Sequence, residues 1–482
     1  MNSNRRSFLK MATAGTGGLL LTSLAGYASV GELNEAIQEN QRKTKSHKQL
    51  FNMCNYAAPA IPVVRIGYVG IGGRGSGAVE RMTNVKDVQI KALCDIREVA
   101  VKSNQETLKR KGLPAAAEYF GSETAFKKMC ERDDIDLIYI ATSWDWHTPI
   151  ALYAMEHGKH VACEVPTAKT LEEAWQLVET SERTRKHCMQ LENCCYDFFE
   201  TLTINMAQQG LLGELIHGEG AYIHPLLESM FSKPDSPTGY VNEGWRWKEN
   251  QISGNPYPTH GLGPVALAME INRGDAFEYL TSMSSNDFMM EQLAEKLIAT
   301  GDPYYKQFGN KHYRGNMNTS IIKTYKGKTI MVQHDVSSPR PYSRIHTLSG
   351  TKGFAQKYPE PGRITLGHSE AATPEEMKKY EELYTPEVVK HVADVAKVIG
   401  GHGGMDFIMD WRLIDCLRNG LALDMDVYDA AAWCSVTPLS RWSVANRSNS
   451  IDVPDFTGGL WKINKRVDLT LRGGGNTAIV AR

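Results

Sequence analysis

Three glycines near residue 70 have the spacing of a turn that binds dinucleotides. Gly70, Gly72 and Gly75 form a G-x-G-x-x-G motif directly after the apolar run 63–69. In such a turn the first glycine permits a tight bend, the second lets the backbone approach a pyrophosphate, and the third lets a helix pack closely on the strand. The N–H groups at the start of that helix then bind the phosphates. The motif predicts a strand, a turn and a helix that hold a dinucleotide, although such turns can also merely connect elements.

An acidic residue follows at a position that suits a ribose contact. Asp95 comes directly after the next apolar segment, 88–94, at about the 20-residue spacing found in NAD sites. Its carboxylate would accept hydrogen bonds from the ribose hydroxyls of NAD and repel the 2′-phosphate of NADP. Arg97 is close enough to weaken that preference. NAD is the cofactor we expect.

Further polar and aromatic residues follow two other predicted strands. Segment 135–142 is followed by Trp144, Asp145, Trp146 and His147, and segment 160–165 contains Glu164 near its end. In an open parallel sheet, ligands bind outside the carboxyl ends of the strands. These side chains are therefore predicted to surround the cofactor, although the tryptophans could instead pack against the edge of the sheet.

The pattern along the chain predicts an α/β fold with two domains. From 61 to 190, strands alternate with helices, as in a doubly wound parallel sheet of the Rossmann type. From 191 to 482, alternating patterns and helices predict an α+β domain with an open, mostly antiparallel sheet. Its expected strands are 215–225, 319–325, 328–336 and 343–349, and its expected helices are 201–209, 263–271 and 404–420. Residues 29–60 are expected to form a linker or N-terminal arm, and 287–318 a long loop.

Length, charge and cysteine spacing exclude several classes of partner. At 482 residues the chain suits two or three domains. The net charge of −1 gives no reason to expect nucleic acid or an anionic membrane surface as a partner. The nine cysteines include no C-x-x-C pair, so their spacing fits neither a zinc site nor a disulfide framework. We expect no metal, and we expect the cysteines to be mostly buried as small apolar side chains.

The first 28 residues have the features of an export signal. Arg5 and Arg6 precede a mildly apolar stretch rich in glycine and alanine, with small residues suitable for cleavage at 26–28. The alternative is a membrane anchor, but the stretch is too short and too rich in glycine to hold a span well. A twin-arginine signal exports folded proteins. We therefore predict a periplasmic protein that leaves the cytoplasm with its cofactor bound.

The segments around the predicted cofactor site resemble the Gfo/Idh/MocA oxidoreductase superfamily. Its members combine a Rossmann domain with an open sheet used for sugar binding and oligomerisation, so a homo-oligomer is expected. Most of them have a G-K-H-V-x-x-E-K-P motif whose lysine assists hydride transfer. Here G-K-H-V-A-C-E-V-P (158–166) has Val165 at that position. Ordinary alcohol dehydrogenation would therefore lack its usual base.

Further motifs narrow the resemblance to glycoside hydrolase family 109, whose founding members are NAD-dependent α-N-acetylgalactosaminidases. The motifs are W-D-W-H (144–147), L-E-N-C-C-Y (191–196), G-A-Y-I-H (220–224), W-R (245–246), Y-P-T-H-G-L-G-P (257–264), I-N-R-G (271–274), R-P-Y (340–342) and H-G-G-M-D-F (402–407). These motifs occur in a similar order in family 109, and the resemblance covers about residues 61–445.

The resemblance implies that NAD stays tightly bound and is regenerated in each cycle. The C3 hydroxyl of the sugar is oxidised to a ketone, a base removes the acidified C2 proton, and the C1 substituent leaves by elimination. Water then adds back and the ketone is reduced. No net redox occurs, which suits an exported protein, because the periplasm holds no pool of nicotinamide cofactor. Two carboxylates flanking the glycosidic bond are not required.

The resemblance also implies the site residues. NAD contacts would be Gly73, Arg74, Asp95, Trp144, Asp145, Trp146, His147, Glu164, Val165, Asn193 and Tyr257. Sugar contacts would be Tyr222, Arg246, Tyr257, Pro258, Thr259, His260 and Tyr342. His260 is the first candidate for the general base or acid, because imidazole titrates near neutral pH. Tyr257, Tyr196 and His224 are the next candidates for proton transfer. Each of these residues could instead be structural.

Departures from the family pattern leave the exact sugar open. Asp197, Pro225 and Pro166 stand where the family usually has arginine, aspartate and serine. These changes suggest a different sugar or aglycone. Two other functions remain open: a net NAD-dependent oxidoreductase acting on a sugar or polyol, and a non-catalytic subunit that binds a sugar or cofactor.

Overall fold

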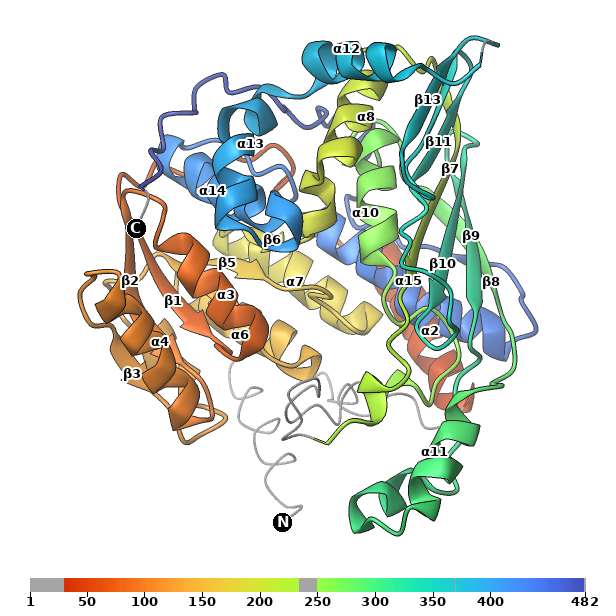
Figure 1. Cartoon of the computed structure of the whole chain (residues 1–482), viewed down its shortest axis with the longest axis horizontal. Coiled ribbons are helices and arrows are strands. Elements are labelled where there is room, and N and C mark those ends of the chain that lie inside the picture. Colours follow the sequence, from red (N-terminus) through yellow and green to blue (C-terminus); the bar gives the residue numbers. More distant parts are fainter. Residues whose placement is uncertain (1–29, 234–248, 369, 481–482) are drawn as a thin grey trace.

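Two β-sheets organise the chain, and they lie on opposite sides of the molecule with helices between them (Figure 1). The structure is a computed structural model that describes residues 30–233, 249–368 and 370–480. The predicted signal segment 1–28 and Arg246 lie outside the described residues.

The first sheet has six parallel strands in the order β3-β2-β1-β4-β5-β6, which confirms the predicted doubly wound sheet. Its strands are β1 (Val64–Val69), β2 (Val88–Cys94), β3 (Ala117–Tyr119), β4 (Leu137–Ile140), β5 (His160–Cys163) and β6 (Cys188–Gln190). Every residue of β4 and β5 is buried, as expected for a parallel sheet covered on both faces.

Helices from both halves of the chain cover this sheet. The N-terminal half supplies α3 (Gly73–Met82), α4 (Glu98–Arg110), α5 (Phe126–Cys130), α6 (His147–Glu156) and α7 (Leu171–Thr184). From the C-terminal half, α14 (Met405–Asn419) packs against α3 and β1, and α15 (Val427–Ala445) packs against α7 and β6. The C-terminal half therefore contributes to the core of both sheets.

The second sheet has eight strands in the order β13-β12-β11-β7-β10-β9-β8-β14. They are β7 (Leu215–Ile223), β8 (Phe277–Ser284), β9 (Asn318–Thr324), β10 (Thr329–Asp335), β11 (Thr347–Gly350), β12 (Gly353–Gln356), β13 (Arg363–Leu366) and β14 (Ile451–Asp452). Strands β7 and β10 pair in parallel, and the other pairs are antiparallel. The predicted open, mostly antiparallel sheet is confirmed.

Helix α10 (Thr259–Ala268) lies directly against strand β7. A Cβ atom on Gly220 would lie 2.2 Å from the carbonyl oxygen of Gly261. A Cβ atom on Gly261 would lie 2.1 Å from the backbone nitrogen of Ala221. Neither position has room for a side chain, so the backbone of β7 directly limits where the first turn of α10 can lie.

The start of α10 differs from the prediction. The sequence pattern placed a helix at 263–271, but α10 begins at Thr259 and therefore carries His260 in its first turn. This turn contains two glycines and is followed by Pro264, which are poor helix formers. Contact with β7 overrides that low propensity.

Two segments expected to lack regular structure contain helices. Residues 29–60, expected as a linker or arm, contain α2 (Val30–Ser46), which packs against α7 and α15. The expected loop 287–318 contains α11 (Met290–Ala299) and the 3-10 helix η4 (Pro303–Phe308). Apolar residues of α11 recur at helical spacing and pack in a small separate core with Phe231, so the loop prediction was wrong.

Four other helices pack against α10, against α14 or against one another. They are α8 (Phe198–Gln208), α12 (Pro374–Tyr384), α13 (Glu387–Ile399) and the short 3-10 helix η2 (Asn193–Tyr196). In the part of the chain that the structure describes, no helix is long and apolar enough to cross a membrane. All nine cysteines are buried and unpaired, as predicted.

The segment after α2 is held by a buried histidine. The side chain of His47 is 4% exposed and lies 3.6 Å from a carboxylate oxygen of Glu179 and 3.8 Å from one of Glu182, both on α7. These two carboxylates raise the pKa of His47 from 6.5 to about 9. The imidazolium is therefore the form that attaches this segment to the Rossmann domain.

We expect the stability contributed by His47 to depend on pH. Because its pKa is raised on folding, the contribution is complete below pH 6.5, declines as the pH rises, and is lost above about pH 9. At pH 7 it is on the order of 2 kcal/mol. Thermal unfolding of His47→Asn should show lower stability than the wild type at pH 7 and no difference at pH 10. The exposed His312→Asn serves as control, and an equal loss at both pH values would contradict the assignment.

Candidate active site

The glycine turn has the geometry that a dinucleotide requires. Gly70 has φ +80°, and a Cβ atom there would lie 2.6 Å from the backbone nitrogen of Thr142. A Cβ atom on Gly75 would lie 1.9 Å from the carbonyl oxygen of Gly70. The first and third glycines thus provide the tight bend and the close helix–strand packing that the motif predicts. Helix α3 begins at Gly73, so its N-terminus points to the place where a pyrophosphate binds.

Asp95 lies at the carboxyl end of β2, where the ribose is expected. Its Oδ2 accepts a hydrogen bond from the N–H of Ile71 (3.0 Å), and its Oδ1 accepts hydrogen bonds from the N–H and Nε of Arg97 (2.9 and 3.2 Å). The carboxylate therefore ties the glycine turn to the end of the strand. Arg97 pairs with it, and this pairing reduces the charge that would repel a 2′-phosphate. The turn, the helix N-terminus and this acid together fit NAD.

The Trp144–Trp146 turn connects the cofactor side to the segment that precedes α10. The ring of Trp144 stacks on Tyr257, with centroids 5.3 Å apart and planes 7° from parallel. Asp145 pairs with Lys169 at 2.6 Å. The two ring nitrogens of His147 lie 2.8 Å and 3.0 Å from the backbone carbonyls of Pro166 and Thr142. Burial lowers the pKa of His147, so the ring is neutral and donates one hydrogen bond to these carbonyls. His147 therefore orients this turn through the backbone.

A buried aspartate joins several of the predicted cofactor contacts. Arg74 donates to Glu164 Oε1 (2.6 Å) and to Asp406 Oδ2 (2.5 Å), and Asn193 donates to Asp406 Oδ1 (2.6 Å). Burial opposes ionisation of Asp406, but a hydrogen bond with His402 and the charges of Arg74 and Arg81 hold its pKa well below the usual range. Asp406 lies in the first turn of α14, where the helix dipole also favours an anion. Val165 is buried beside Glu164.

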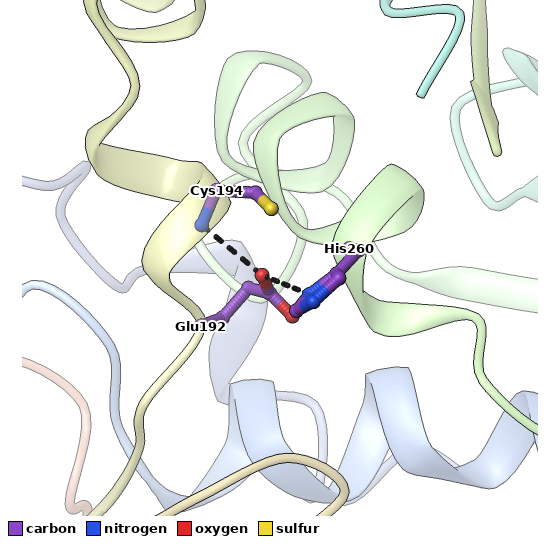
Figure 2. A group of neighbouring side chains, drawn as sticks. All are labelled: Glu192, Cys194 and His260. Carbon is purple, nitrogen blue, oxygen red and sulfur yellow. Dashed lines mark hydrogen bonds and ion pairs between the residues drawn. The ribbon is translucent and has the colours of Figure 1, made fainter. Parts of the chain in front are cut away.

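His260 lies at the centre of the second group of predicted residues. Its Nδ1 lies 2.7 Å from Glu192 Oε1 (Figure 2). Its Nε2 lies 3.5 Å from the hydroxyl of Tyr257. The ring of Tyr222 lies 5.4 Å from the His260 ring and 4.9 Å from the Tyr257 ring. Pro258 is the N-cap of α10, and Thr259 is fully buried. The structure thus brings together a carboxylate, an imidazole and two phenols.

Glu192 was not predicted, although it belongs to the motif 191–196. Its side chain is fully buried. Burial alone would raise its pKa, but the neighbouring His260, the hydroxyl of Thr259 and the N–H of Cys194 lower it overall. The signal available in the sequence was the acid within the motif 191–196, but only the fold shows that it is buried and which histidine it meets.

Glu192, Cys194 and His260 are also the described residues closest to a metal-binding set. One ligand atom from each lies within 4.8 Å of the others (Figure 2). Two ligands of a tetrahedral zinc ion stand roughly 3.3 Å apart, given metal–ligand distances of about 2.0–2.1 Å. The separation of 2.7 Å between Glu192 and His260 is that of a direct hydrogen bond. Burial also raises the pKa of the Cys194 thiol well above its usual value, so the set favours proton transfer over metal binding.

A cavity of about 410 Å³ opens beside His260. Predicted residues that line it are Asn193, Tyr222, His224, His260 and Tyr342. Residues that were not predicted as contacts also line it: Cys194, Asp197, Arg344, Lys357, Tyr358, Glu360, His402 and Met405. The volume is within the range of about 300–1,000 Å³ typical of small-ligand sites.

One wall of the cavity is a closed cluster of charges. Arg344 pairs with Asp197 (2.9 Å) and Glu200 (2.6 Å), and Lys357 pairs with the same two acids (2.6 and 3.2 Å). Arg344 also donates to the hydroxyl of Tyr342 at 2.9 Å. Asp197, one of the departures from the family pattern, is therefore part of the wall that a ligand would meet.

Tyr196 does not reach the cavity, which corrects its prediction as a proton-transfer residue. Its hydroxyl is buried and donates to Asp424 Oδ2 at 3.1 Å. Burial raises the pKa of this phenol well above its usual value. The turn of η2 directs Asn193 and Cys194 into the cavity and Tyr196 away from it. Arg246 lies outside the described residues, and Pro225 is exposed next to His224.

We expect Gly75→Ala to prevent cofactor binding, because the new methyl group would clash with the carbonyl oxygen of Gly70. The variant should lose bound NAD, measured by absorbance after denaturation, and about 1–3 kcal/mol of stability. Gly73→Ala is the matched stability control, since a Cβ atom there has nothing within 4 Å. An unfolding temperature and NAD content equal to wild type in Gly75→Ala would refute this role of the turn.

Comparison with known proteins places both halves of this site in one family. The sequence model described as "Oxidoreductase family, NAD-binding Rossmann fold" matches residues 64–191, and that described as "Glycosyl hydrolase 109, C-terminal domain" matches residues 196–463. The chain is 49% identical to a protein named alpha-N-acetylgalactosaminidase from Bacteroides fragilis, over 87% of this chain and 97% of that one. It is 47% identical to a glycosyl hydrolase family 109 protein from Porphyromonas gingivalis, over 84% and 86%.

Solved structures share the fold at low sequence identity. An NAD binding oxidoreductase from Klebsiella pneumoniae aligns with a TM-score of 0.61 and 14% identity, over 82% of this chain and 99% of that one. A levoglucosan dehydrogenase in complex with NADH and levoglucosan aligns with a TM-score of 0.58 and 16% identity, over 81% and 100%. The two matched domains together cover residues 64 to 463 except for 192–195, and the chain belongs to glycoside hydrolase family 109.

Proposed function

We propose that this protein hydrolyses terminal α-N-acetylgalactosaminides, or a closely related glycoside, with NAD held permanently in its Rossmann domain. The observation that carries the proposal is the stacking of Trp144 on Tyr257, with His260 3.5 Å from the Tyr257 hydroxyl. This contact holds Tyr257 and His260, which can transfer protons, beside the carboxyl edge of the parallel sheet, where a nicotinamide binds. The relative named alpha-N-acetylgalactosaminidase supports the choice of sugar.

When bound, NAD supplies reversible oxidation of the C3 hydroxyl of the sugar, which makes the C2 proton acidic. His260 is the residue that takes this proton at Nε2, because Nδ1 is occupied by Glu192. Tyr257 shares the proton through its hydroxyl. Tyr222 and Tyr342 line the cavity and orient the sugar ring.

A net sugar or polyol dehydrogenase is the weaker alternative. It requires a proton carrier at the position of Val165, whose side chain is apolar and 4% exposed. Lys169 is the lysine nearest to Val165 in the sequence. Its ammonium group is paired with Asp145 and Glu249. The arrangement around His260 also argues against a non-catalytic binding subunit, since binding alone requires no buried carboxylate behind an imidazole.

We also propose that the protein is exported in its folded form. The support is the pair Arg5 and Arg6 ahead of an apolar stretch rich in glycine and alanine. An enzyme that regenerates its own cofactor can work in a compartment that has no nicotinamide pool.

Changing both signal arginines to lysine should block export. In a Gram-negative host, the wild type should be recovered from the periplasm with its N-terminus cleaved near residue 28 and NAD bound. Arg5→Lys with Arg6→Lys should accumulate uncleaved in the cytoplasm, whereas Arg42→Lys should behave as wild type. Cell fractionation shows the location of each variant, and intact-mass measurement shows whether its N-terminus is cleaved. Export of the double variant at wild-type level would argue against a twin-arginine signal.

The reaction itself can be tested in D₂O with no added cofactor. Using an aryl α-N-acetylgalactosaminide, we expect the released sugar to carry one deuterium at C2, measured by mass spectrometry, because the proton removed there exchanges with solvent. His260→Ala should lower kcat by roughly 10²- to 10⁴-fold while NAD stays bound. The exposed His157→Ala is the control and should match the wild type. Release of sugar without deuterium would point to direct displacement and against this mechanism.

A further inference from the structure

We propose that Glu192 is a positioning residue that holds His260 in the tautomer with its proton on Nδ1, so that Nε2 faces the cavity as the proton acceptor. This inference rests on the proposed function for its chemistry, but its geometry stands independently. Figure 2 shows the Glu192 carboxylate behind the His260 ring, bridging the ring and the backbone of Cys194.

The hydrogen bonds define which nitrogen carries the proton. Glu192 Oε1 accepts from the N–H of Cys194 at 3.2 Å and lies 2.7 Å from His260 Nδ1. The lowered pKa of Glu192 keeps this acid ionised near neutral pH, and an ionised carboxylate can only accept. Nδ1 must therefore donate, which leaves the lone pair of the neutral ring on Nε2.

The Glu192 carboxylate also stabilises the protonated ring of His260 against the unfavourable dipole of α10. His260 is the second residue of α10, and the positive end of a helix dipole disfavours an imidazolium there. Glu192 is fully buried, so little solvent screens its attraction for that charge. The glycine contacts between α10 and β7 keep the ring from moving away from this partner.

Several other titratable groups face His260 or the cavity beside it. They are Cys194 on η2, Tyr257 before α10, Tyr222 and His224 on or next to β7, and Asp197, Tyr342, Arg344, Lys357, Tyr358, Glu360 and His402 on the other walls. Among the described residues, Glu192 is the one that lies within hydrogen-bond distance of Nδ1. The charged pairs of Asp197 with Arg344 and Lys357 are satisfied within their own cluster.

The proton balance is simple. The C2–H bond of the oxidised sugar breaks, its proton forms a bond to Nε2, and the electron pair stays on the sugar. The ring becomes an imidazolium and Glu192 remains a carboxylate. The proton later returns to solvent, so the side chains end the cycle as they began it.

The first test is Glu192→Gln in the full-length holoenzyme. It keeps the shape but removes the charge that supports the imidazolium, so kcat should fall roughly 10²- to 10⁴-fold with little change in KM. The acidic limb of the pH–kcat profile should move to lower pH. Glu192→Asp should recover part of the activity. Glu182→Gln, a buried acid on α7 far from the cavity lining, controls for the cost of removing a buried carboxylate and should leave kcat unchanged.

The second test does not depend on turnover. Long-range ¹H–¹⁵N NMR of the histidine-labelled holoenzyme reads the tautomer of each ring, with His260→Gln assigning the signal. We expect wild-type His260 to be protonated at Nδ1, and Glu192→Gln to lose that single tautomer. A wild-type ring protonated at Nε2, or a Glu192→Gln variant with unchanged kcat and pH profile, would overturn the proposal. If the wild type shows the Nδ1 tautomer but releases no sugar, the proposed function fails and the positioning role stands.

Discussion

The direct contact of helix α10 with strand β7 is the constraint on which the site depends. Gly220 and Gly261 meet backbone to backbone, with no room for a side chain between them. Atoms in such close contact cannot move nearer to each other, so the helix cannot approach the strand any further. The first turn of α10 carries His260, and the strand beneath carries Tyr222, so their separation is set by the packing of main chains. Proton transfer tolerates errors of only about 0.5 Å, which explains why glycine occupies both positions.

The site joins two halves that are distant in the sequence. The parallel sheet contributes the glycine turn, Asp95 and the tryptophan turn, all at the carboxyl ends of its strands. The second domain contributes Tyr257 and His260. Trp144 stacked on Tyr257 connects the halves on one side, and Asp406 connects them on the other through Arg74 and Asn193. Because α14 carries Asp406 and packs on the Rossmann sheet, the two domains share a core rather than a hinge.

The far wall of the cavity suggests how a neutral ligand is accommodated. Asp197 and Glu200 are matched by Arg344 and Lys357, so the buried charges compensate one another. Leaving any one of them unpaired would be strongly unfavourable, which makes the four a single unit. Together with the phenols of Tyr342 and Tyr358, these four residues give the cavity wall several hydrogen-bonding groups and no dominant charge. Such a wall suits the hydroxyl groups of a glycoside.

The sequence by itself determined the features that depend on neighbouring residues along the chain: the glycine turn, Asp95 at the end of its strand, the parallel character of the first sheet and the mostly antiparallel character of the second. These follow from local spacing and periodicity. The sequence did not predict the features that tertiary contacts determine. Helix α10 starts at Thr259 against its own propensity because β7 supports it. In the motif 191–196, the sequence singled out Tyr196, yet the 3-10 turn buries that hydroxyl against Asp424. Glu192 meets His260, 68 residues further on, because the turn that contains η2 packs against α10, and no local pattern records a contact made across that distance.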